Sequence, residues 1–376
     1  MDFGFTSEQE DIRSLAEKLF GDFCKTERLP DFEKASERLD RELWKALADA
    51  GLLGVALPEE FGGMGFGIAE LAILLEQAGR FVAPIPLFPT LVLGAAPIAE
   101  FGSDAQKKRW LGEVVTGKTI LTAALVESDT RDASRPTTTA NADGTAWTLD
   151  GVKICVPAAH LASRIVVPAT TADGSIIMAL VSPEADGVTL DAQETTSGDL
   201  FYRVTLAGVK VATDDLLAGP DRGAAVLAWL LERSIAGLCA MELGIAERAL
   251  RMTAKYTAER KQFGKVIATF QAVAQRAADA YIDVEAVRLT TWQAIWRLAE
   301  GLPATRELSI AKFWASEGGH RACYAAQHLH GGIGVDKDYP LHRYYLLSKQ
   351  IELTLGGAHE HLARIGAQLA AGRMPA

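Results

Sequence analysis

Positive charge is scarce in this sequence. Its 376 residues include 38 Lys and Arg against 48 Asp and Glu, which gives a formal net charge of −10 at pH 7. Because phosphate backbones and anionic lipid surfaces are bound by concentrated positive charge, this balance argues against a nucleic-acid binder or an anionic-membrane binder. The chain also lacks a run of about 18 uncharged apolar residues, so we expect no conventional membrane span.

Cysteine is sparse as well, and clustered metal ligands are lacking. The four cysteines are far apart in the chain: Cys24, Cys155, Cys239 and Cys323. Neither a zinc cluster nor a disulfide scaffold is indicated, and the His-x-His pairs at 328–330 and 359–361 have no acidic or thiol ligand at suitable spacing. Residues 1–4 lack the basic start of an export signal. We therefore expect a cytoplasmic protein without a metal site.

The hydrophobic pattern changes twice along the chain. Up to about residue 120, leucines recur at helical spacing, as at Leu43 and Leu47. Short β-rich runs such as 165–167 and 201–206 then alternate with Asp-Gly turn signals, which favours a small antiparallel barrel or sandwich. Apolar helices continue from there to the C-terminus and predict a bundle. The sequence thus predicts an α+β fold with domains at 1–120, 121–220 and 221–376.

Two glycine-rich stretches, 62–67 and 331–334, have backbone amides that a phosphate could approach closely. The first lacks the Gly-x-Gly-x-x-Gly spacing and follows a helical pattern, so a Rossmann turn is not indicated. The second lacks the Gly-Lys-Ser/Thr ending of a P-loop. On residue types alone, a structural turn is the first interpretation, and backbone contact with a ligand is the alternative.

Glu232 stands out within the apolar helix that follows residue 223. Its neighbours one turn away are Ala228, Trp229, Ile235 and Ala236. Arg233 points about 100° away around the helix, so we expect no basic partner for Glu232 in this helix. Burial of such a carboxylate raises its pKa toward the range of a general base. A salt bridge to another helix, or a solvent-facing edge, is the alternative.

Several motifs together resemble the acyl-CoA dehydrogenase family. The most recognisable is Arg260-Lys261-Gln262-Phe263-Gly264-Lys265, followed by Phe270-Gln271. Further similar stretches, in chain order, are 51–55, 58–63, 101–104, 107–111, 329–334 and 339–343. The resemblance spans nearly the whole chain.

This resemblance implies an N-terminal helical domain, a central β-barrel and a C-terminal four-helix bundle, assembled as a homo- or heterotetramer. It also implies FAD as the cofactor, an acyl-CoA as the substrate and an electron-transfer flavoprotein as the electron acceptor. In the family's reaction, a carboxylate removes the α-proton of the thioester and a hydride passes from the β-carbon to FAD. Hydrogen bonds that stabilise the developing enolate charge assist this removal.

The catalytic base is not where most family members have it. That position precedes a Gly-Thr/Ser pair near the C-terminus, and here it is Leu355, which cannot accept a proton. A minority of the family places the base on the bundle helix immediately before an arginine. Glu232-Arg233 matches that arrangement, so Glu232 is the candidate base.

The candidate flavin contacts fall into two groups. The chain's own pocket departs from the family in two places. The stretch 126–133 has an aspartate near the expected pyrophosphate, with Arg131 to compensate for its charge. The family's Trp-Ile-Thr stretch is replaced by residues 155–157, which end in a proline without an amide donor. A second group resembles the residues that contact the adenosine diphosphate of a neighbouring subunit's FAD. This group is intact, except that His328 stands where Gln is usual. Its members are Arg260, Gln262, Phe263, Gln271, His328, Gly331 and Gly332. We call these seven residues the ADP-contact set. This asymmetry predicts one half of a heteromeric dehydrogenase, of the kind that the family uses for bulky acyl-CoA substrates such as steroid side chains.

Three functions therefore stay open. The first is an active FAD-dependent acyl-CoA dehydrogenase with Glu232 as base, alone or as a catalytic partner. The second is a non-catalytic subunit that lends ADP contacts to a partner's FAD. The third is a flavin oxidase or hydroxylase-like relative that acts on a substrate other than an acyl-CoA.

Overall fold

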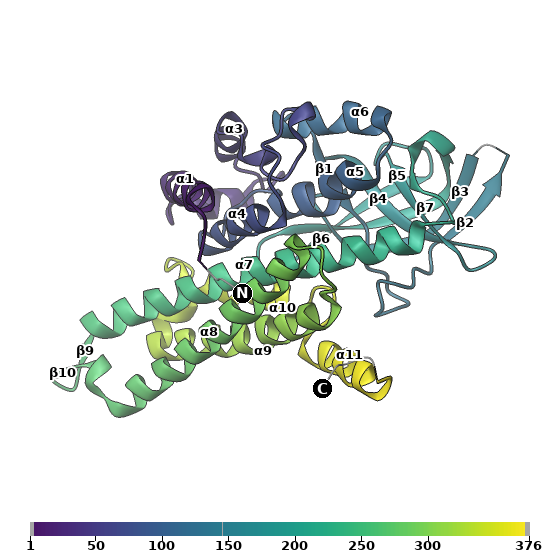
Figure 1. Cartoon of the computed structure of the whole chain (residues 1–376). Coiled ribbons are helices and arrows are strands. Elements are labelled where there is room, and N and C mark those ends of the chain that lie inside the picture. The colour runs from purple at the N-terminus through teal and green to yellow at the C-terminus, as the bar shows by residue number, and fades with distance from the viewer. Residues whose placement is uncertain (1–3, 145, 373–376) are drawn as a thin grey trace. The chain divides into compact units, whose positions relative to one another are not determined.

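The computed structural model describes residues 4–144 and 146–372, which form two compact units. The first unit comprises Met1–Leu29, Ala72–Ala83 and Ile235–Ala376. The second comprises Pro30–Leu71 and Pro84–Ser234. Figure 1 shows helices at both ends of the sequence and strands between them. The predicted order of helical, β and helical elements is confirmed, whereas the domain boundaries near 120 and 220 stay a prediction.

The second unit begins with short helices, of which α3 and α6 have side-chain caps. They are α2 (Leu29–Lys34), α3 (Arg41–Asp49), η1 (Leu52–Gly54), η2 (Glu59–Phe61), η3 (Pro89–Ala95), α5 (Ala96–Phe101) and α6 (Asp104–Val115). The Asp40 carboxylate accepts hydrogen bonds from the first free amides of α3, and Ser103 forms a capping box with Gln106 at the start of α6. These caps set where the helices begin.

The strands of this unit form one sheet. They are β1 (Ile120–Ala123), β2 (Thr139–Asp143), β3 (Ala146–Pro157), β4 (Ala162–Thr171), β5 (Ile176–Val181), β6 (Val188–Glu194), β7 (Leu200–Ala212) and β8 (Leu216–Ala218), with η4 (Thr213–Asp215) before the last. The order is β6-β7-β3-β2-β4-β5-β8, and β1 pairs with β4. Alternate strand residues such as Leu149, Ile165 and Val204 form a buried core.

The α+β class with a central sheet is confirmed, but the expected β-barrel is not: no closed barrel is found in the part of the chain that the structure describes. The sheet is open, with β6 and β8 as its end strands. Two pairings, β1 with β4 and β2 with β4, are parallel, and β2 pairs with β4 over only two residues. Strand patterns in a sequence predict the strands themselves, but closure depends on which strands meet, and the pattern does not encode this.

The first unit is helical. It contains α1 (Ser7–Phe23), part of α4 (Ile68–Arg80), most of α7 (Gly223–Glu259), α8 (Gln271–Ala299), α9 (Thr305–His330), α10 (Leu341–Leu353) and α11 (Ala358–Ala370). Between α7 and α8 lie β9 (Lys261–Gln262), β10 (Lys265–Val266) and η5 (Ile267–Thr269), and η6 (Gly331–Val335) follows α9. Close contact between α4 and α7 depends on Gly244, because a Cβ there would lie 1.9 Å from the Glu76 carbonyl oxygen.

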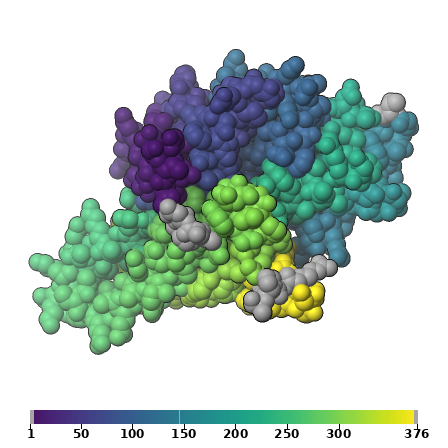
Figure 2. All heavy atoms as spheres, viewed as in Figure 1, coloured from purple at the N-terminus to yellow at the C-terminus, as the bar shows by residue number. Residues whose placement is uncertain are grey.

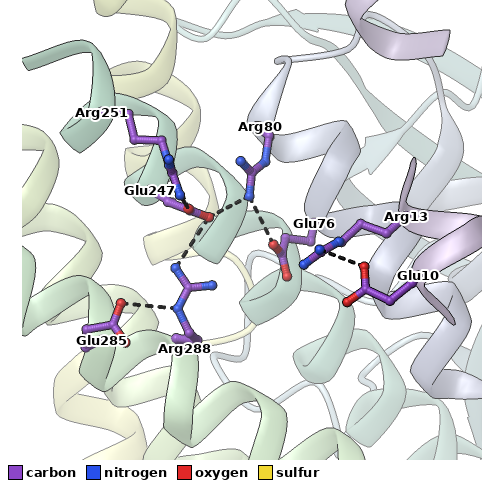
Figure 3. Close-up of polar contacts among 8 residues, drawn as sticks. All are labelled: Glu10, Arg13, Glu76, Arg80, Glu247, Arg251, Glu285 and Arg288. Atoms are coloured by element: carbon purple, nitrogen blue, oxygen red, sulfur yellow. Dashed lines mark hydrogen bonds and ion pairs between the residues drawn. The ribbon is translucent and has the colours of Figure 1, made fainter. Parts of the chain in front are cut away.

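A network of charged residues joins α4, α7 and α8 within this unit (Figure 3). Glu247 on α7 lies among three guanidinium groups and accepts bonds from Arg80 at 2.5 Å and Arg251 at 2.6 Å, with Arg288 at 3.4 Å. Arg80 also contacts Glu76, and burial raises the pKa of the Glu76 carboxyl group. Since Glu247 is buried, these ion pairs are shielded from solvent screening.

One helix among the described residues, α7, is long and apolar enough to cross a membrane by length and composition alone. This test allows up to two charged residues in the window, whereas the expectation concerned an uninterrupted run of uncharged apolar residues, which Glu232, Arg233 and Glu242 break in α7. The protein itself buries 56% of the apolar window, and the core helix of a soluble protein meets the same test. The finding is weak support for a membrane span.

Candidate functional site

The ADP-contact set lies around a short hairpin at the end of α7. The Arg260 amide donates to the Tyr256 carbonyl at 2.9 Å, which extends the end of the helix. The Arg260 carbonyl accepts from the Ile267 amide at 2.9 Å, which closes the hairpin of β9 and β10. Phe263, at the turn, has φ +54° and packs edge-on against Phe270 with ring centroids 6.3 Å apart. Gln271 then begins α8, so four of the seven residues lie close together (Figure 1).

The remaining members lie at the end of α9. His328 is exposed, and Gly331 ends the helix with φ 65° and ψ −143°, a conformation open essentially to glycine. A Cβ built on Gly331 or Gly332 would meet nothing within 4 Å, so both backbones are accessible. The rings of Tyr256 and His330 stack with centroids 4.4 Å apart, which brings the ends of α7 and α9 together. The structure therefore gathers the ADP-contact set at one end of the helices.

The exposure and charge of this end suit an anionic ligand. Phe263 is 91% exposed, and the segment around residue 260 (green in Figure 2) lies at the surface of its unit. Residues 251–265 carry five basic side chains and one acidic side chain in a chain that is acidic overall. Guanidinium, amide and glycine N–H donors are the groups that bind diphosphates. These residues fit the adenosine-diphosphate end of FAD.

The segment of β3 where the resemblance places the flavin ring does not fit that group. The Cys155 amide already donates to the Gln193 side-chain oxygen at 2.9 Å, and Pro157 has no amide. The Pro157 carbonyl in turn accepts from Thr122 at 2.7 Å. Cys155 has φ +52°, and the register of β3 against β7 shifts here. Of the three residues 155–157, Cys155 has its amide occupied and Pro157 has none to offer a flavin.

In the loop expected to hold the flavin pyrophosphate, polar groups are bonded to one another. The Asp132 carboxylate accepts from the Ser134 amide and hydroxyl at 3.1 and 2.7 Å, and the Asp132 amide donates to Thr130. Arg135 lies 3.7 Å from the same carboxylate. A carboxylate held in this loop repels a pyrophosphate, so the loop does not fit the group either.

Sequence reasoning missed a buried ion pair close to this segment. The Lys153 ammonium lies 2.6 Å from Glu127, and both side chains are buried. Burial by itself raises the pKa of Glu127, but Lys153 and hydrogen bonds from Thr138 and Thr137 outweigh it and lower that pKa to about 2. Burial lowers the pKa of Lys153 to about 8. The available signal was a lysine between two apolar β-formers, Val152 and Ile154.

Glu232 lies in the second unit, near the start of α7. The expectation that it has no basic partner in its own helix is wrong, because the Arg233 guanidinium is 3.7 Å from its carboxylate. Arg233 also stacks over the Trp229 ring at 3.9 Å, which turns its side chain back along the helix toward Glu232. Ideal helix angles do not include such bending of a long side chain. The Glu232 side chain is 31% exposed, which lies between the buried setting of a perturbed carboxylate and the solvent-facing edge that was the alternative.

The turn that contains Leu355 is held by two buried side chains. The Lys312 ammonium donates to the carbonyl oxygens of Ile351, Glu352 and Gly356 at 2.9–3.1 Å. His361 bonds the Leu355 carbonyl at 3.2 Å. Burial lowers the pKa of Lys312 to about 8. Burial, together with the nearby charges of Lys312 and Arg364, lowers the pKa of His361 to about 4. The turn is ordered, although residue 355 has no proton acceptor.

No group of three or more His, Cys, Asp or Glu side chains that could hold a metal ion occurs within residues 4–144 and 146–372. Glu232 and the ADP-contact set belong to different units. The structure therefore supports two separate sets of candidate residues, described each within its own unit.

Comparison with known proteins gives the same family over both helical regions. Residues 6–118 match the family described as Acyl-CoA dehydrogenase, N-terminal domain, and residues 221–370 match Acyl-CoA dehydrogenase, C-terminal domain. The curated relative FadE27, an acyl-CoA dehydrogenase of Mycobacterium tuberculosis, is 40% identical over 98% of this chain and 99% of its own length. The caffeyl-CoA reductase-Etf complex subunit CarC of Acetobacterium woodii is 31% identical over 91% of this chain and 92% of its own.

Solved structures agree with this assignment. The ChsE4-ChsE5 complex of Mycobacterium tuberculosis contains a chain with a TM-score of 0.93 and 40% identity, and all of both chains is covered. A variant of the Tcur3481-Tcur3483 steroid ACAD has a TM-score of 0.91 and 44% identity, with 97% of this chain and 98% of that chain covered. These likenesses extend over the strands as well as the helices.

Proposed function

Because this chain belongs to the acyl-CoA dehydrogenase family, we propose that it is one subunit of a heteromeric, FAD-dependent acyl-CoA dehydrogenase. The observation that carries the proposal is an asymmetry between two sets of flavin contacts. The ADP-contact set is assembled and exposed, whereas in the β3 segment the Cys155 amide is occupied and Pro157 has no amide. A chain of this kind can contribute to a flavin site without completing one of its own.

The similar proteins support a mixed assembly and a large substrate. One solved relative is a complex of two differently named chains, and another is named a steroid ACAD. We propose an acyl-CoA with a bulky group such as a steroid side chain as the substrate, and a tetramer built from two kinds of chain. CarC belongs to a complex with Etf, which supports an electron-transfer flavoprotein as the electron acceptor.

Within this proposal each set of residues has its own task. FAD, when bound, supplies the acceptor for the hydride that leaves the acyl β-carbon. The Arg260 guanidinium neutralises diphosphate charge, and the glycine backbones of 331 and 332 allow the diphosphate to come close. Glu232 is the candidate that takes the α-proton, since a carboxylate beside the thioester is a sufficient base.

The second candidate function is a non-catalytic subunit that only lends ADP contacts to a partner's FAD. Two observations favour it: the occupied β3 amides, and a Glu232 carboxylate that is partly exposed and close to Arg233. In that case a different chain supplies the base. The two functions make opposite predictions for a change at Glu232.

Replacing Glu232 by Gln in the assembled complex separates these functions. If Glu232 is the base, Glu232→Gln lowers kcat by about 100- to 10,000-fold with little change in KM, because the amide cannot take a proton. The control is Glu184→Gln, which changes an exposed carboxylate elsewhere in the same unit. Unchanged turnover in the Glu232→Gln complex would assign the chain the non-catalytic role.

We also propose a cytosolic location for the chain. The four cysteines Cys24, Cys155, Cys239 and Cys323 are free thiols. Free thiols persist most readily in a reducing compartment. Fractionation of the native cell, followed by detection of the chain, tests this location.

A further inference from the structure

Three aromatic rings from separate segments meet beside the ADP-contact set. His330, the last residue of α9, stacks on Tyr256 of α7 with an interplanar angle of 19° and is tilted against Tyr339 with centroids 5.3 Å apart. The His330 side chain is buried, and the whole residue is 4% exposed. The ring therefore joins α7, α9 and the loop before α10 at one point.

Hydrogen bonds fix the tautomer of this ring. Nδ1 lies 2.8 Å from the Ala326 carbonyl oxygen, which only accepts, so Nδ1 carries the proton. In the neutral ring Nε2 is then an acceptor, and the Tyr339 hydroxyl donates to it at 3.2 Å. Burial lowers the pKa of His330, which keeps the ring neutral near pH 7. Each edge and face of the ring thus has a defined partner.

Each of these partners leads to members of the ADP-contact set. Tyr256 is one helical turn before Arg260, and its carbonyl accepts from the Arg260 amide. On the other side, Gly331 follows His330 directly, and the turn folds back so closely that a Cβ on Gly334 would lie 3.2 Å from the His330 Cβ. The chain then continues to Tyr339, and the Tyr339 hydroxyl bonds to Nε2 of the His330 ring.

We propose that His330 is the positioning residue of the ADP-contact set. Its face holds the hairpin that bears Arg260, and its Nε2 holds the Gly331–Gly332 turn, so that donors from two helices form one surface. The proposal rests on the proposed function, in which this surface binds the diphosphate of FAD. His330 itself does not touch the ligand.

Hydrogen–deuterium exchange on the full chain tests the two halves of this role separately. His330→Phe keeps a flat ring against Tyr256 but removes both hydrogen bonds, and Tyr339→Phe removes only the bond to Nε2. Both variants lose the bond between Nε2 and Tyr339, so in both we expect exchange to rise about two- to tenfold in 331–339 and to stay unchanged in 257–267. His330→Ala removes the stack as well, so exchange also rises by about two- to tenfold in 257–267.

The control is His359→Ala, an exposed histidine of the same unit, which leaves exchange unchanged in both segments. Equal loosening of both segments in His330→Phe and His330→Ala would overturn the proposal, as would no loosening in any variant. The outcome does not depend on His330→Ala being well folded, because His330→Phe and Tyr339→Phe alone predict loosening confined to 331–339.

Exchange with saturating ADP as the probe links this role to the site. In the wild-type chain ADP is expected to protect Gly331 and Gly332, and in His330→Ala this protection is lost. If ADP protects neither glycine in the wild type while the variants still loosen the two segments separately, the positioning role stands and the proposed ADP site fails. If ADP protects both equally in wild type and His330→Ala, His330 positions nothing that the ligand needs.

Discussion

Lys153 lies in an environment unlike that of an ordinary lysine. It is fully buried, and its ammonium is bonded to Glu127 and to the Pro168 carbonyl oxygen at 2.8 Å. Removing one member of a buried pair leaves the other charge without compensation, which is costlier than the loss of the bond itself. The pair also anchors the part of β3 next to Cys155.

Lys153→Met is therefore expected to lower the free energy of unfolding by about 3–5 kcal/mol. Urea unfolding at pH 7 measures this change. The matched control is Lys210→Met, which removes an exposed partner of Asp143 and should change the free energy of unfolding by about 1 kcal/mol or less. Equal effects of the two variants would contradict the buried character of the Lys153 pair.

Glu127 makes stability depend on acid pH. Its pKa is about 2 in the folded chain and lies at the ordinary value of 4.5 when the group is released, so the unfolded chain takes up the proton first. The stabilisation is complete above pH 4.5, and about 3 kcal/mol is lost as the pH falls toward 2. Urea midpoints at pH 7 and pH 3 should differ less in Glu127→Gln than in the wild type. An identical pH dependence in both would count against this assignment.

Single residues were predictable from the sequence where a motif named them, and not where a contact decides. The motif from Arg260 to Gln271 was recognised because its residues are nearly consecutive in the chain, whereas the hairpin that it forms was not predicted. The approach of Arg233 to Glu232 was not predictable from the sequence, because it depends on the stacking of the Arg233 guanidinium over Trp229. The burial of Lys153 was missed because lysine is exposed in most proteins, and only its partners reveal the exception.

At the scale of elements, the charged network of Figure 3 holds together α4, α7 and α8 of the first unit. Glu247 is the carboxylate shared by three arginines, so a change there affects contacts between all three helices at once. The figure also contains a second pair, Glu10 with Arg13 on α1, which is exposed.

Glu247→Gln is expected to lower the free energy of unfolding by about 3 kcal/mol, because three guanidinium groups lose their shared charge in a buried setting. Glu10→Gln, at an exposed pair, should cost less than about 1 kcal/mol. Thermal or urea unfolding of both variants measures the difference. If Glu247→Gln is as stable as the wild type, the network does not join these helices energetically.

The elements themselves followed from the sequence better than their assembly did. Leu43 and Leu47, which show helical spacing in the sequence, lie in α3, and the β-rich runs 165–167 and 201–206 lie in β4 and β7. The closed barrel did not follow, because the short parallel pairing of β2 with β4 is a contact between distant residues that leaves no periodicity in the chain.

At the scale of the whole molecule, the chain has two sets of candidate flavin contacts, of which the ADP-contact set is assembled and the set in its own pocket is not. We propose that the exposed ADP-contact set serves a neighbouring subunit, and the occupied Cys155 amide and Pro157 support the proposal that the chain's own pocket stays without FAD. The family could be recognised from motifs spread over the sequence. The division of labour between two kinds of chain rests on the hydrogen bonds that the folded chain makes.

The flavin content of the purified chain tests this claim most directly. Visible flavin absorbance, measured against protein concentration, should be negligible for the chain purified alone. The same measurement on the complex with its partner chain should give one FAD for each pair of unlike chains. A yellow homotetramer of this chain alone, with one FAD per subunit, would contradict the account.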